Sequence, residues 1–146
     1  MDPENPVVGL CVQGMEEEDK GNASVAARLF EQAWAESSTD YERCIAAHYV
    51  ARHQLSAELA LEWNQRAMGC AERVQDGSVA EFLPSLYLNL GKSHEDVGNT
   101  VEARRQYSCA AGKVAALPAG AYRDIVQDGI DRGLQRVERF SESLGP

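Results

Sequence analysis

The residues best suited to chemistry in this chain are its histidines, its cysteines and the acidic residues beside them. Cys44 and His48 are four residues apart, a spacing that places both side chains on one face of a helix, within reach of one metal ion. His94 and Glu95 begin like the zinc-protease pattern, but Gly98 stands where that pattern needs its second histidine. Two ligands do not make a metal site. The sequence therefore predicts no metal site, no cofactor and no catalytic residue.

Other patterns of catalysis are also missing from the sequence. It has neither the glycine-rich loops that bind phosphates nor the Gly-x-Ser-x-Gly turn of serine hydrolases. Its four cysteines are widely spaced, and no pair has the Cys-x-x-Cys spacing of a zinc module. We therefore expect a protein that is not an enzyme and whose reduced cysteines pack as small hydrophobic residues.

The charge of the chain limits its partners. The 146 residues carry a formal net charge of -9, and an acidic chain repels the phosphates of nucleic acids and of anionic lipids. No apolar run approaches the roughly 20 residues that span a membrane. Residues 1–6 are polar and rich in proline, unlike a secretion signal. We expect a cytoplasmic protein with a disordered N-terminus over 1–6 and with no nucleic-acid or membrane partner.

Two segments of the chain repeat one pattern of residue types. Each reads small residue, turn glycine, small residue, aromatic residue, alanine, in steps of seven, five, four and three residues. Such agreement at five positions indicates an internal repeat. The positions are Gly14, Gly21, Ala26, Phe30 and Ala33 in the first segment and Gly91, Gly98, Ala103, Tyr107 and Ala110 in the second, 77 residues later.

A third, degenerate copy fits between these two segments. A shift of 34 residues from the first segment places alanines at Ala60 and Ala67, as the pattern requires. Leu55 replaces the turn glycine and Asn64 replaces the aromatic residue. The extra length that remains is expected in a turn between Gly69 and Pro84, so the sequence predicts three helical hairpins of unequal quality.

The third copy, with Leu90-Gly91, His94, Gly98, Ala103, Tyr107 and Ala110, resembles the tetratricopeptide repeat, a 34-residue helix-turn-helix family. The resemblance implies an all-α fold of three antiparallel hairpins in a right-handed superhelix. We expect one domain over 7–142, with repeats at about 7–39, 40–79 and 80–118 and a capping helix at about 120–141. The expected helices are 7–19, 24–37, 40–53, 56–74, 81–97, 100–116 and 120–141.

The seventh helix has an apolar stripe, formed by Tyr122, Val126, Gly129, Ile130, Gly133, Leu134, Val137 and Phe140. Stacks of repeats expose a hydrophobic end unless a terminal element covers it. We expect this helix to be that cover, and a dimerisation helix is the alternative.

The resemblance also implies where a partner would bind. In the family, first helices of successive repeats line a concave groove that binds a peptide or protein, and the matching residues here form an apolar floor with a charged rim. A groove of this kind suits a neutral or mildly basic segment. The residues are Val8, Cys11, Met15, Ile45, Tyr49, Arg52, His53, Leu88, Lys92 and Asp96.

Several readings of this groove remain open. The floor could be covered by the seventh helix or by the proline-rich N-terminus, or it could be buried in a homodimer. As to function, the sequence favours an adaptor or scaffold that binds a protein partner. The alternatives are a chaperone-like helper dedicated to one partner and a structural protein that forms homodimers.

Overall fold

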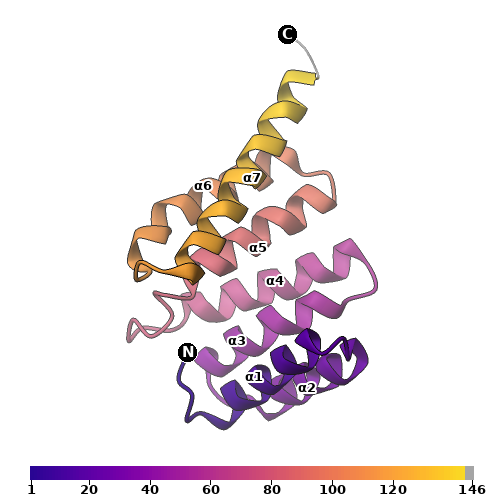
Figure 1. Cartoon of the computed structure of the whole chain (residues 1–146), viewed down its shortest axis with the longest axis vertical. Coiled ribbons are helices and arrows are strands. Elements are labelled where there is room, and N and C mark those ends of the chain that lie inside the picture. Colours follow the sequence, from indigo (N-terminus) through magenta and orange to yellow (C-terminus); the bar gives the residue numbers. More distant parts are fainter. Residues whose placement is uncertain (144–146) are drawn as a thin grey trace. The chain divides into compact units, whose positions relative to one another are not determined.

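The computed structural model describes the backbone of residues 1–143 and the side chains of residues 1–141. Within this part, seven α-helices and two short 3-10 helices form the fold, and no residue is in a β-strand (Figure 1). The predicted all-α fold of helical hairpins is confirmed. The helices are α1 (Pro6–Asp19), α2 (Ala23–Glu36), α3 (Asp40–Val50), η1 (Ala51–His53), α4 (Ala57–Glu72), α5 (Leu83–Asp96), α6 (Thr100–Lys113), η2 (Val114–Ala116) and α7 (Ala121–Ser143).

The chain divides into two compact units. Unit 1 is Met1–Val79 and holds α1 to α4, while unit 2 begins at Ala80 and holds α5, α6 and α7. The segment that joins α4 to α5 is the turn expected from the extra length of the middle repeat, with Gly77 at a φ of 78°.

The turns inside the first and third hairpins have the same geometry. Gly21 and Gly98 follow α1 and α5 with φ angles of 82° and 87°, which glycine adopts at little cost. In each turn the glycine N–H donates to the carbonyl three residues earlier at 3.0 Å, and the N–H of the next residue, Asn22 or Asn99, donates to the carbonyl five residues earlier at 2.8 Å. This is the Schellman motif, and it ends both helices at equivalent positions.

Close packing of a glycine against an aromatic ring holds each of these hairpins together. Phe30 on α2 lies against Gly14 on α1, and Tyr107 on α6 lies against Gly91 on α5, where an added Cβ atom would be 2.6 Å from two ring carbons. Both rings are fully buried. Flanking alanines are also fully buried, which lets the paired helices approach; they are Ala26, Ala33, Ala103 and Ala110.

The middle hairpin, α3 with α4, packs differently. Asn64 is buried where the other hairpins have an aromatic ring, Ala67 is fully buried, and Ala60 is half-buried. Trp34 on α2 and Trp63 on α4 meet edge to face, with ring centroids 5.0 Å apart. An aromatic pair between second helices thus accompanies the missing aromatic residue inside the hairpin.

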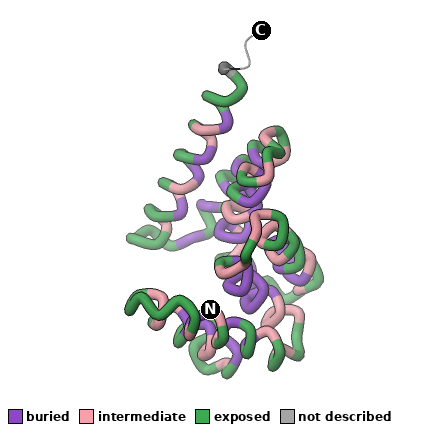
Figure 2. The backbone as a smooth tube through the Cα atoms, turned by 90° about the vertical axis from the view of Figure 1, so that its right-hand side faces the viewer, coloured by how far each residue is buried: buried purple, intermediate pink, exposed green. Residues whose placement is uncertain are grey.

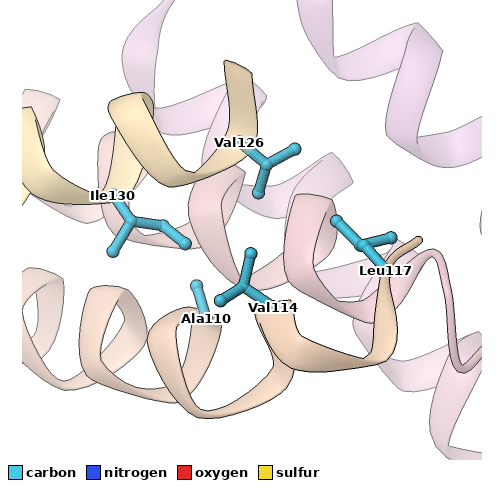
Figure 3. Close-up of a cluster of buried hydrophobic side chains, with 5 residues drawn as sticks. All are labelled: Ala110, Val114, Leu117, Val126 and Ile130. Carbon is cyan, nitrogen blue, oxygen red and sulfur yellow. The ribbon is translucent and has the colours of Figure 1, made fainter. Parts of the chain in front are cut away.

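In unit 2, α7 packs on both helices of the hairpin before it. Val126 and Ile130 on α7 point toward Ala110 and Val114, and Leu117 completes this buried cluster (Figure 3). A second cluster joins Val137 on α7 to Ala103 and Tyr107 on α6. The apolar stripe of α7 therefore supplies much of the core of unit 2, although Tyr122 and Phe140 at its ends are about half exposed, at 51% and 49%.

The two faces of α7 differ in polarity. Buried positions recur along one side of the helix (Figure 2), whereas α3 in unit 1 is buried at every position from Cys44 to Val50. A helix with a polar outer side needs no further helix against it, so α7 is able to close unit 2. Its exposed outer residues are Asp124, Asp128, Asp131, Gln135 and Glu138.

The N-terminal segment differs from the expected disorder over 1–6. Pro6 is the first residue of α1, and the Asn5 side chain caps this helix by accepting from the N–H groups of Val7 at 2.8 Å and Val8 at 3.2 Å. The same side chain donates to Glu42 on α3 at 3.0 Å. The physical reason for the order is that one asparagine serves both helices.

Candidate functional site

The residues of the expected groove divide between the two units. Seven of them belong to unit 1 and three to unit 2, and each group is described within its own unit. The unit 1 residues are Val8, Cys11, Met15, Ile45, Tyr49, Arg52 and His53. The unit 2 residues are Leu88, Lys92 and Asp96.

The expected apolar floor in unit 1 is part of the core. Val8 and Cys11 on α1 are fully buried, and Ile45 on α3 is 1% exposed. Burial raises the pKa of the Cys11 thiol to about 12, so this thiol stays protonated. Because α3 packs across both α1 and α2, these side chains fill the space between helices and offer no open surface.

A stack of aromatic rings continues this core toward the end of α3. The Phe30 ring stacks on Tyr49 with centroids 5.2 Å apart and on His53 at 5.6 Å. His48 meets the Tyr49 ring edge to face at 4.9 Å. Burial, and secondly the positive charge of Arg52, lower the pKa of His48 to about 3, so His48 is a neutral core residue.

The charged residues at this end of unit 1 form an ion-pair group. Glu18 on α1 accepts hydrogen bonds from Arg52 at 2.8 Å, and its second carboxylate oxygen lies 2.8 Å from His53 Nε2. The guanidinium carbon of Arg52 also lies 4.8 Å from the centroid of the Tyr49 ring. Arg52, with 42% of its side chain exposed, therefore joins the acidic end of α1 to the aromatic stack.

Unit 2 contains an equivalent group. Arg136 on α7 donates to both carboxylate oxygens of Glu95 on α5, and the buried Tyr107 hydroxyl donates to the same carboxylate at 2.7 Å. Burial acts to raise the pKa of Glu95, but the hydrogen bonds from Arg136 and Tyr107 outweigh it and hold this pKa below its ordinary value. Burial and the neighbouring Glu95 raise the pKa of Tyr107.

The sequence reasoning did not find these pairs, although a signal was present. Glu18 and Glu95 are 77 residues apart, the same offset as the paired glycines. Each helix that follows a hairpin supplies the arginine three residues after its contact with the aromatic ring: Arg52 after Tyr49, and Arg136 after Gly133. The equivalence shows that α7 packs on its hairpin in the register that α3 uses.

One face of α3 also contacts the N-terminal segment. The backbone N–H of Asp2 donates to the Tyr41 hydroxyl at 3.1 Å, and the Tyr49 hydroxyl lies 3.9 Å from the sulfur of Met1. Hydrogen bonds from Ser38, and then from Asn5, lower the pKa of Glu42, so its carboxylate stays charged. We call the surface formed by Tyr41, Glu42, Tyr49 and Arg52 the α3 surface.

The three groove residues of unit 2 do not form a comparable surface. Leu88 is half-buried between α5 and α7, where it packs against both buried clusters and lies beside Gly129. Lys92 and Asp96 form an ion pair at 2.8 Å one turn apart on α5, and both side chains are about half exposed. Leu88 therefore acts in the core of unit 2.

The described side chains include no group of three or more histidine, cysteine, aspartate or glutamate residues that could hold a metal ion. Cys44 and His48 are both buried in unit 1. No described helix of the chain has the length and apolar character that crossing a membrane requires. Comparison of the chain with protein-family models, curated proteins and solved structures finds no match.

Proposed function

We propose that this protein is a non-enzymatic, tetratricopeptide-like binding module, and that a short segment of a partner protein binds to the α3 surface of unit 1. The observation that carries the proposal is the make-up of this surface. It combines two tyrosines with an arginine, the residue types that most often anchor protein interfaces. Its cover in the structure is the extended segment 1–5.

The contacts made by that segment indicate the chemistry of a partner. Tyr41 accepts a hydrogen bond from a backbone N–H, Glu42 accepts one from an amide group, and the Tyr49 ring has a thioether side chain beside it. The charged carboxylates of Glu42 and Glu18 disfavour a strongly acidic ligand. A neutral or mildly basic segment with one unbranched apolar side chain fits best.

The proposed binding is of ordinary strength and takes place in the cytoplasm. A single surface of this size suits an affinity near the micromolar range, about -8 kcal/mol. The net charge of -9 supports a protein partner over nucleic acid or an anionic membrane. No cofactor is needed for this function.

A photo-cross-linking amino acid at position 41 tests the proposal. Tyr122 provides the matched control, since Tyr41 and Tyr122 are each the second residue of their helices, α3 and α7. After irradiation in native lysate, the position 41 protein should form an adduct with a specific partner, identified by mass spectrometry, and the position 122 protein should not. An adduct with twice the mass of the chain would instead indicate a homodimer. Equal labelling from both positions, or none, would contradict the proposal.

A further inference from the structure

We propose that residues 1–5 are a displaceable cover that competes, within the same chain, with the partner for the α3 surface; this inference rests on the proposed function. The chain's own segment occupies three points on that surface, at Tyr41, Glu42 and Tyr49. The protein thus carries a weak internal ligand for its own site.

The cover has a fixed end at Asn5. The Asn5 side-chain oxygen caps α1 through Val7 and Val8, while its amide nitrogen donates to Glu42. The capping contacts lie within α1 and its cap, so they persist when the residues before Asn5 leave the surface. Opening therefore needs no change in the packing of the helices.

The part of the cover before Asn5 is held weakly. Met1 is 52% exposed, and the sequence between it and Asn5 is exposed and polar. Its contacts with α3 are one hydrogen bond to a tyrosine hydroxyl and one long hydroxyl–sulfur contact. Exposed contacts of this kind exchange readily with water, so the closed and open forms differ little in free energy.

Such a cover changes the affinity that a partner experiences. A short tether keeps the segment at an effective concentration in the millimolar range, on the order of what weak contacts need for partial occupancy. The partner binds the open fraction, so its apparent dissociation constant rises in inverse proportion to that fraction. A partner segment with a better apolar anchor than Met1 displaces the cover.

A synthetic peptide of residues 1–5 with a fluorescent label at its C-terminus is the probe for this competition. The test variant is the full chain with Asp2→Gly, Pro3→Ser and Glu4→Gly, which keeps the Asn5 cap and changes exposed residues alone. By fluorescence polarisation, the variant should bind the peptide at least fivefold more tightly than the wild-type chain. Equal binding to both proteins, or none to the variant, would overturn the inference.

Two further measurements separate failure of the cover from failure of the proposed function. In the wild-type chain labelled with ¹³C-methyl methionine, the Met1 signal should lie upfield of free methionine because of the Tyr49 ring; a signal at the free position overturns the inference. In the cross-linking experiment at position 41, the triple variant should form several-fold more partner adduct than wild type, and equal amounts overturn the inference. The peptide and methyl signals need no partner, so an absent adduct alone contradicts the proposed function.

Discussion

Arg136 on α7 donates to both carboxylate oxygens of Glu95 on α5, at 2.8 and 3.1 Å. The pair lies beside the buried hydroxyl of Tyr107, which donates to the same carboxylate. Three helices of unit 2 therefore meet at one charged group. Ion pairs with two parallel hydrogen bonds and partial burial are stronger than exposed pairs, so this contact should matter for stability.

Removing the Arg136 charge tests that expectation. Arg136→Met should lower the free energy of unfolding by about 1–2 kcal/mol, because Glu95 loses its charged donors in a partly buried position. Lys92→Met is the matched control, since Lys92 pairs with Asp96 in solvent and should change stability by less than about 0.5 kcal/mol. Urea unfolding measures both. Similar losses for the two variants would mean that the Glu95 pair is an ordinary surface pair.

Glycine positions in unit 1 offer a second test, with opposite signs. Gly14→Ala should destabilise the protein by about 1–3 kcal/mol, because two Phe30 ring carbons lie 2.8 Å from the new Cβ position and a third is closer. Gly69→Ala on α4 meets no atom within 4 Å and should stabilise by about 0.5–1 kcal/mol through helix propensity. Thermal unfolding distinguishes the two, and stabilisation by both changes would refute the close approach of α1 and α2.

The role of α7 in the core of unit 2 predicts a large effect at Ile130. Ile130→Ala removes a fully buried side chain from the cluster with Ala110 and Val114, and should cost about 2–5 kcal/mol. Ile125→Ala, at a position 69% exposed on the same helix, should cost less than about 1 kcal/mol. If chemical denaturation shows equal losses, α7 is an appendage and does not close the unit.

His48 predicts a dependence of stability on pH. Its pKa is lowered to about 3 in the folded protein by burial and then by Arg52, against 6.5 without these effects. Below 6.5 the unfolded chain binds a proton that the folded protein does not, so the contribution is complete above 6.5 and is lost as pH falls toward 3. The slope from this residue is at most about 1.4 kcal/mol per pH unit. Urea unfolding between about pH 7 and pH 5 should show a shallower decline for His48→Phe than for wild type; parallel declines would show that His48 is not the cause.

The sequence was sufficient to predict the helices because their signals are local. Helix-breaking turns, glycines and the 3.6-residue period set each boundary, and the repeated Gly21 and Gly98 turns defined the hairpins. The division into two units was not predicted, since it depends on which helices contact each other across the chain. Order at residues 1–5 was also missed, because it results from Asn5 reaching Glu42 on α3, a contact distant in sequence.

The candidate site was harder to predict than the fold. Alignment to the repeat correctly placed Tyr49 and Arg52 on the same face of α3 but could not show how tightly α3 packs across the first hairpin. Val8, Cys11 and Ile45 are apolar in either situation, so composition does not distinguish a groove floor from a core. Tyr41, the residue that meets the N-terminal segment, was not among the expected groove residues.

The most direct test of the account compares capture of the partner identified by cross-linking by two variants, Tyr41→Asp and Tyr122→Asp. Each places a carboxylate in the first turn of a helix, where the helix dipole favours a negative charge, so both proteins should stay folded, as circular dichroism checks. The account predicts that Tyr41→Asp lowers capture at least tenfold and that Tyr122→Asp captures as well as wild type. Undiminished capture by folded Tyr41→Asp would contradict the assignment of the α3 surface as the binding site.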